Sequence, residues 1–190
     1  MKVIFTKTGE RRYSVTVEGP GIDKATMDPA PGFDPRLPHD AAHFIAENEL
    51  GIAGGVFGQL AAGGTANTFF SDESKKPRKA KKRGRTLAKA NKEDAAFSEH
   101  AVYAAQSRWE RHQVVPQTDI PEADLAGIIE GFEDFASKWS RLSVGESITM
   151  EWQQPRRSGI PIAWTAIRNG RLAGQRGCCD PDHDRQWSVS

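Results

Sequence analysis

The chain has 190 residues, of which 37% are hydrophobic and 27% are charged, and its formal net charge at neutral pH is +1. No stretch approaches the roughly 18 consecutive apolar residues that a membrane-spanning helix needs, and the N-terminal segment lacks the pattern of a secretory signal. The two cysteines are adjacent in the sequence, which excludes a disulfide framework and a cysteine-rich zinc finger. The composition predicts a soluble, cytoplasmic protein that folds as a single domain over residues 1–190.

The small net charge conceals one strongly basic segment. Residues 71–93 carry a net charge of +7, so the rest of the chain carries −6, and eight of the eleven positions from Lys75 to Arg85 are Lys or Arg. Because such a run repels itself and has no apolar face to bury, we expect a basic flexible insertion over residues 71–93. Lys75 to Arg85 either contact a nucleic acid or an acidic partner, or form a solubilising linker. The run contains no aromatic residue to stack on bases, which favours the linker.

The N-terminal part of the chain predicts a β-hairpin followed by a loop. Residues 2–8 and 12–18 each alternate apolar and polar side chains, and a glycine-containing turn separates them, which is typical of two antiparallel strands. Residues 19–38 contain five prolines and three glycines. This composition predicts a long irregular loop.

The middle of the chain predicts helices on both sides of the basic insertion. Residues 39–50 have helix-forming composition and follow Pro38, a residue that suits a helix start. The glycine-rich residues 51–64 indicate either a second, closely packed helix or a glycine loop, and they lack the Gly-Lys-Ser/Thr ending of a phosphate-binding loop. Residues 94–112 and about 121–142 predict two further helices, and the second has a continuous apolar stripe.

The C-terminal part predicts strands and then a polar tail. Residues 146–152 and 160–168 alternate apolar and polar side chains, Asn169-Gly170 is a strong hairpin signal, and residues 174–190 are polar and without pattern. Strands near both chain ends with helices between them indicate an α+β fold. We expect about four helices packed on one antiparallel sheet that the N-terminal and C-terminal hairpins form together.

Two histidines and two carboxylates carry the chemical signal of the sequence. His39, His43 and Glu47 are spaced four residues apart in an expected helix, where residues one turn apart have Cβ atoms about 5–6 Å apart. Paired imidazoles at this spacing can hold one metal ion, and Glu47 is the carboxylate on the same stripe. The sequence predicts His39, His43 and Glu47 as ligands of a divalent metal ion, zinc by preference, with Asp40 as catalytic base or as support for a ligand.

Other interpretations of these residues stay open. The two histidines could instead be partly buried side chains that cap a helix and bond to backbone groups. His100 could face the same site from another helix, and the ligand-rich tail CCDPDHD over residues 178–184 is a weaker candidate because it mixes soft and hard ligands.

Two resemblances extend this interpretation. The stretch from Pro38 to Phe70 resembles a segment shared by bacterial proteins of unknown function, in which P-H-D-x-x-H-F-x-x-E precedes G-G-x-F-G-x-L-A-x-G-G. This resemblance implies a bacterial source and no particular activity. The His39-Asp40-x-x-His43 pattern is also loosely similar to the H-E-x-x-H of zincin peptidases, with Asp40 in the place of their glutamate.

The sequence thus predicts a small metal-binding protein, a metal-dependent hydrolase if it is an enzyme. The alternative is a non-enzymatic adaptor or nucleic-acid-associated protein that acts through the basic insertion.

Overall fold

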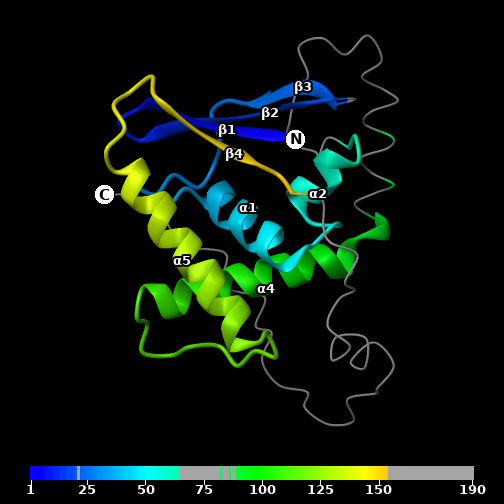
Figure 1. Ribbon diagram of the computed structural model, residues 1–190, viewed down its shortest axis with the longest axis vertical. Coiled ribbons are helices and arrows are strands. Elements are labelled where there is room, and N and C mark those ends of the chain that lie inside the picture. Colours follow the sequence, from blue (N-terminus) through cyan, green and yellow to red (C-terminus); the bar gives the residue numbers. More distant parts are fainter. Residues whose placement is uncertain (21, 65–81, 83–85, 87–88, 154–190) are drawn as a thin grey trace, which may run out of the picture. The chain divides into compact units, whose positions relative to one another are not determined.

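The sheet joins the two ends of the described chain. The computed structural model describes residues 1–20, 22–64, 82, 86 and 89–153, which belong to one structural unit, Met1–Arg157. Its strands are β1 (Lys2–Gly9), β2 (Arg12–Gly19), β3 (Ile22–Met27) and β4 (Ser147–Glu151). They form one antiparallel sheet in the order β3-β2-β1-β4 (Figure 1). The α+β fold expected from the sequence is confirmed.

The predicted N-terminal hairpin is confirmed, because β1 and β2 pair as antiparallel strands. Val3 pairs with Val17 and Phe5 with Val15, so the apolar residues of both strands lie on the same face of the sheet. Five side chains on this face are fully buried: Val3, Phe5, Tyr13, Val15 and Val17. On the other side of β1, Phe5 pairs with Ile148 of β4.

The expected irregular loop over residues 19–38 is wrong in its first part. Residues 22–27 form β3, which pairs with β2 through Val15 and Met27 and through Val17 and Ala25. Ala25 and Met27 are both buried. This strand has only two apolar core residues between proline-rich segments, so its sequence pattern is too short to separate it from a loop.

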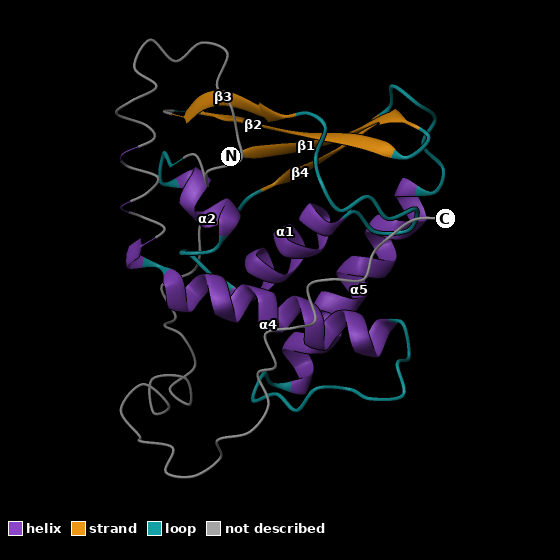
Figure 2. Ribbon diagram, turned by 180° about the vertical axis from the view of Figure 1, so that it is seen from behind, coloured by secondary structure: helices purple, strands orange, loops and turns teal. Residues whose placement is uncertain are grey.

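The helices lie on one face of the sheet and α1 lies at their centre. They are α1 (His39–Leu50), α2 (Val56–Ala61), α4 (Lys92–Trp109) and α5 (Glu122–Trp139). Helix α1 contacts α2, α4 and α5, and Figure 2 shows it between the sheet and α4. Phe44 of α1 meets Phe5 of β1 edge to face, with ring centroids 6.1 Å apart.

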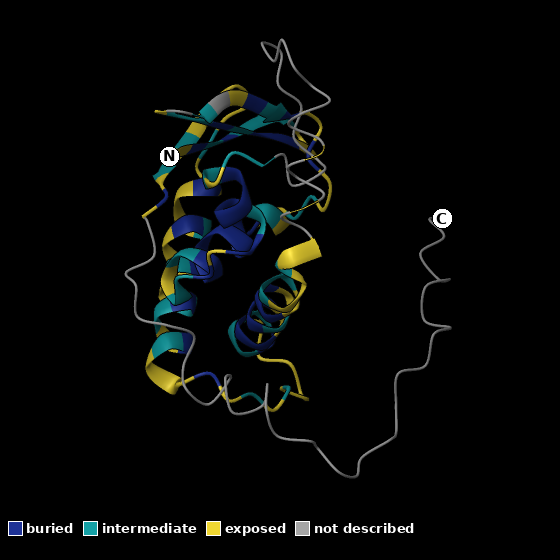
Figure 3. Cartoon of the chain, turned by 90° about the vertical axis from the view of Figure 1, so that its right-hand side faces the viewer, coloured by how far each residue is buried: buried dark blue, intermediate teal, exposed yellow. Residues whose placement is uncertain are grey.

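Burial follows from this central position. All seven residues from Ala41 to Glu47 are buried, and buried residues gather where the sheet and helices meet (Figure 3). A helix enclosed on all sides normally carries apolar residues all round. In α1 the two buried exceptions are His43 and Glu47, so each needs a polar partner from a neighbouring helix or loop.

Several sequence predictions lie outside the described residues. These are the strand over residues 160–168, the Asn169-Gly170 turn, the tail over residues 174–190, and, apart from Lys82, the basic run from Lys75 to Arg85. Within the described part of the chain, no helix has the length and apolarity needed to cross a bilayer.

Candidate metal centre

His39 stands at the exposed end of α1. Pro38 occupies the N-cap position, with an extended backbone at φ −52° and ψ 139°, and the His39 N–H donates a hydrogen bond of 3.2 Å to the carbonyl of Gly32. Gly32 has a φ of +67°, and a Cβ atom there would lie 2.7 Å from Cβ of His39. A glycine at this position therefore lets the preceding loop pass close to His39 and fix the start of the helix.

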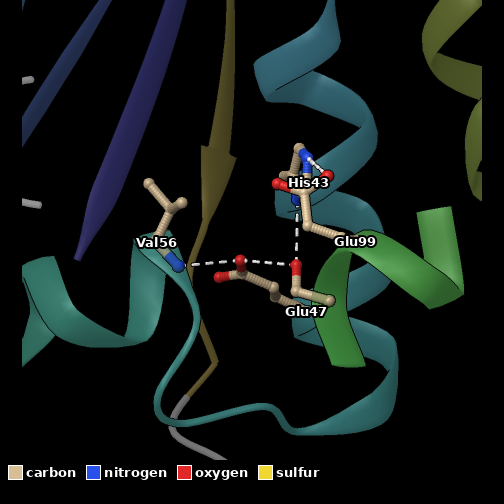
Figure 4. Close-up of polar contacts among 5 residues, drawn as sticks. His43, Glu47, Val56 and Glu99 are labelled. Carbon is tan, nitrogen blue, oxygen red and sulfur yellow. Dashed lines mark hydrogen bonds and ion pairs between the residues drawn. The ribbon is translucent and has the colours of Figure 1, made fainter. Parts of the chain in front are cut away.

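Three side chains converge beside this helix start. The rings of His39 and His43 lie edge to face, with centroids 4.6 Å apart. Nε2 of His43 lies 3.6 Å from Oε2 of Glu99, which comes from α4 (Figure 4). One ligand atom from each of His39, His43 and Glu99 lies within 4.8 Å of the other two, close enough to hold one metal ion. The sequence predicted two members of this group, and the third comes from a different helix.

Glu47, the carboxylate expected from the sequence, lies outside this group. Its Oε1 accepts hydrogen bonds from the Val56 N–H at 2.8 Å and from the Ser98 hydroxyl at 2.9 Å, and its Oε2 accepts one from the Phe57 N–H at 2.8 Å. The side chain is completely buried. Burial raises the pKa of Glu47 to about 7, although these hydrogen bonds oppose the shift.

Ser98 connects Glu47 to the group formed by His39, His43 and Glu99. The Ser98 hydroxyl lies 2.9 Å from Nδ1 of His43 and is buried between α1 and α4. Figure 4 shows a chain of polar contacts that runs from the backbone of Val56 through Glu47 to His43 and then to Glu99. Neither Ser98 nor Glu99 was predicted from the sequence as a site residue. In the sequence they are a polar pair directly after Phe97, in the helix expected over residues 94–112.

His43 is neutral at pH 7 and incompletely bonded. Burial, followed by the nearby charge of His39, lowers the pKa of His43 to about 4. Its side chain is 4% exposed, whereas that of Glu99 is 69% exposed. Nε2 of His43 is buried and has no hydrogen-bond partner among the residues that the structure describes. The group is therefore buried at His43 and exposed to solvent at His39 and Glu99.

Asp40 points to a different contact. Its carboxylate Oδ2 lies 2.5 Å from the hydroxyl of Tyr13 on β2, and that hydroxyl also lies 2.5 Å from the carbonyl of Pro31. Burial raises the pKa of Asp40, against the opposing effects of the Tyr13 hydrogen bond and the His39 charge. Burial and the charge of Asp40 raise the pKa of Tyr13, so the phenol keeps its proton. These contacts fasten the first turn of α1 to the sheet.

The histidine on α4 does not join the group. Nε2 of His100 lies 3.1 Å from the hydroxyl of Thr118, in the loop before α5. The tail over residues 178–184 lies outside the described residues.

Comparisons of the chain with protein-family models, with curated proteins and with solved structures find no match.

Proposed function

We propose that this protein binds one divalent metal ion, zinc by preference, through His39, His43 and Glu99. The observation that carries the proposal is Nε2 of His43, which is buried, faces the Glu99 carboxylate and has no hydrogen-bond partner within the described part of the chain. A neutral imidazole nitrogen without a partner is costly to bury. A cation held between this nitrogen and the carboxylate removes that cost.

The ligand types and spacing suit zinc. Two imidazoles and one carboxylate form a ligand set known from catalytic zinc sites. With zinc–ligand bonds of about 2.0–2.1 Å, two ligands at a tetrahedral angle lie about 3.3 Å apart. The 3.6 Å between His43 and Glu99 needs only a small contraction to reach this value. Glu99 replaces Glu47 as the third ligand in this proposal, because hydrogen-bond donors already engage both oxygens of Glu47.

Zinc binding can be tested by calorimetric titration of chelator-treated full-length protein. We expect one zinc ion per chain, and we expect His39→Ala, His43→Ala and Glu99→Gln each to weaken binding by at least tenfold. His100→Ala and Glu133→Gln are matched controls, since His100 bonds to Thr118 and Glu133 is exposed on α5. Binding that is equally strong in the His39→Ala/His43→Ala double variant contradicts the proposal.

We further propose that the site is hydrolytic. Three protein ligands leave a fourth coordination position, and the exposure of His39 and Glu99 gives it access to solvent. Zinc at such a position lowers the pKa of bound water to about 7 and so supplies hydroxide at neutral pH. Asp40, next to His39, remains the candidate base, although its carboxylate contacts Tyr13.

Activated esters and phosphodiesters are suitable probes of this activity. We expect zinc-dependent cleavage of at least one of them by the wild type and none by His43→Ala. If Asp40 is the base, Asp40→Asn abolishes cleavage and retains zinc. The absence of cleavage by zinc-loaded wild type excludes hydrolysis of these substrate classes and leaves metal binding intact. The adaptor or nucleic-acid alternative depends on Lys75 to Arg85 and stays a prediction from the sequence.

A further inference from the structure

The hydrogen bonds that link Glu47, Ser98 and His43 determine which nitrogen of His43 is free to bind a metal ion. Ser98 lies 2.9 Å from each of these two side chains and is buried. A serine hydroxyl has one hydrogen to donate, and an ionised carboxylate can only accept. With Glu47 ionised, the Ser98 hydrogen must therefore point to Glu47.

The tautomer of His43 follows from this direction. When Ser98 donates to Glu47, its oxygen can only accept from the imidazole, so Nδ1 of His43 carries the hydrogen. Nε2 then presents a lone pair towards Glu99, 3.6 Å away. This is the form of imidazole that binds a metal ion through Nε2.

The opposite hydrogen-bond direction would prevent metal binding through Nε2 of His43. If Ser98 donated to Nδ1 instead, Nε2 would carry the hydrogen and point it at the Glu99 carboxylate. That arrangement needs a hydrogen-bond donor in the place of the Glu47 oxygen that contacts Ser98. A protonated Glu47 could be that donor, since burial raises its pKa to about 7. Above this pH the carboxylate is ionised, and the Val56 and Phe57 N–H groups favour that form, because each donates to one of its oxygens.

We propose that Ser98 and Glu47 are positioning residues of the metal centre, which hold His43 in its Nδ1–H tautomer so that Nε2 is free to bind the metal. This inference concerns the same centre as the proposed function. It makes a statement about the metal-free protein, however, so it can be tested separately. Glu47 has a second contact set at the start of α2, so the arrangement of that helix and the tautomer of His43 depend on one carboxylate.

Nitrogen-15 NMR of the imidazoles in metal-free, full-length protein at pH 8 tests the tautomer directly. The wild type should show His43 protonated at Nδ1. Glu47→Gln should populate the Nε2–H form, because an amide NH2 group that faces Ser98 donates to it, and Ser98 then donates to Nδ1. Ser98→Ala should leave a mixture of tautomers. An Nε2–H form in the wild type, or an unchanged Nδ1–H form in both variants, overturns the inference.

Matched variants separate positioning from general damage to the fold. Ser98→Thr keeps the hydroxyl and should keep the wild-type tautomer. Ser107→Ala makes the same chemical change at a fully buried serine on the same helix, so the tautomer should not change. The Ser107 hydroxyl has no hydrogen-bond partner among the described residues. If Ser98→Thr does not fold, as judged by circular dichroism, the comparison of Ser98→Ala with Ser107→Ala still decides the question.

Zinc titration of the same proteins completes the test. Loss of a partner that orients a metal-ligating histidine typically costs 10–100-fold in metal affinity, so we expect this loss in Ser98→Ala and wild-type affinity in Ser107→Ala. A wild type with the Nδ1–H tautomer and no zinc binding contradicts the proposed function and supports only the part of the inference that assigns the tautomer. Equal zinc affinity in Ser98→Ala and wild type, with an unchanged tautomer, overturns the positioning role and leaves metal binding standing.

Discussion

At the scale of single residues, two buried ionisable groups on α1 respond to pH in opposite directions. Burial raises the pKa of Glu47 from 4.5 to about 7, so between these values the folded chain keeps a proton that the unfolded chain releases. Burial lowers the pKa of His43 from 6.5 to about 4, so the folded chain excludes a proton that the unfolded chain binds. As pH rises, Glu47 lowers the free energy of unfolding and His43 raises it.

Between pH 4.5 and 6.5 the effects of Glu47 and His43 on the free energy of unfolding largely cancel. A substitution that removes one of these groups should therefore reveal the effect of the other. In metal-free Glu47→Gln the Glu47 effect is absent and no longer offsets that of His43, so we expect the free energy of unfolding to rise by roughly 2 kcal/mol from pH 4.5 to 6.5. The raised pKa of Asp40 acts in the opposite direction and makes this rise smaller. Urea unfolding at three pH values measures this rise. The wild type and Glu133→Gln, which changes an exposed carboxylate, should show a much flatter profile. A flat profile in Glu47→Gln contradicts this account of the buried pair.

At the scale of elements, the start of α2 depends on a side chain from α1. Helix α2 has six residues and its N-cap, Gly55, offers no side-chain hydrogen bond. Isolated helices of this length are unstable in water. The Glu47 carboxylate supplies the missing acceptor for the Val56 and Phe57 N–H groups, and a negative charge is favourable at a helix N-terminus. Gly55 permits the approach, because a Cβ atom there would lie 2.2 Å from Cδ of Glu47.

Gly55→Ala should therefore be strongly destabilising. The new methyl group overlaps a buried carboxylate that cannot move without losing its hydrogen bonds, and we expect a loss on the order of 2–4 kcal/mol in the free energy of unfolding. Gly127→Ala in α5 is the control. Its Cβ would meet only the end of the exposed Glu49 side chain, and alanine favours a helix interior over glycine by about 1 kcal/mol. Urea denaturation compares them, and equal effects would contradict the prediction.

At the scale of the whole described unit, Tyr13 fastens the sheet to the helices. It is fully buried on β2, its ring meets that of Trp139 on α5 with centroids 6.2 Å apart, and its hydroxyl contacts Pro31 and Asp40. One side chain thus contacts α5, the loop before α1, and the first turn of α1. The hydroxyl bonds add to the apolar packing of the ring, since buried polar groups without partners are costly.

Tyr13→Phe should isolate the contribution of the hydroxyl. The ring packing stays, but Asp40 loses its bond from the phenol, so we expect the free energy of unfolding to fall by about 1–3 kcal/mol. Tyr103→Phe is a matched control, because Tyr103 is the other tyrosine of the chain and is 58% exposed. Thermal or urea unfolding measures both variants. A similar small effect of the two substitutions would show that the Tyr13 hydroxyl does not fasten α1 to the sheet.

The sequence by itself determined the features that repeat along one element. Alternation gave the β1–β2 hairpin, and Pro38 with the residues after it gave α1. The spacing of His39 and His43 gave their common face, because residues one helical turn apart are neighbours whatever surrounds the helix. The edge strand β3 was not predicted, because it has only two core residues among proline-rich neighbours. Its pairing with β2 defines it as a strand.

Only the tertiary structure decided which carboxylate joins the histidines. Glu47 is eight residues beyond His39, which corresponds to about 12 Å along a helix axis, so the two cannot easily meet at one ion. Glu99 reaches His43 because α4 packs against α1, a contact between residues 56 positions apart that leaves no periodic trace in the sequence. The same packing buries Ser98 between His43 and Glu47. Local spacing therefore determined the pair of imidazoles, and helix packing determined the rest of the candidate centre.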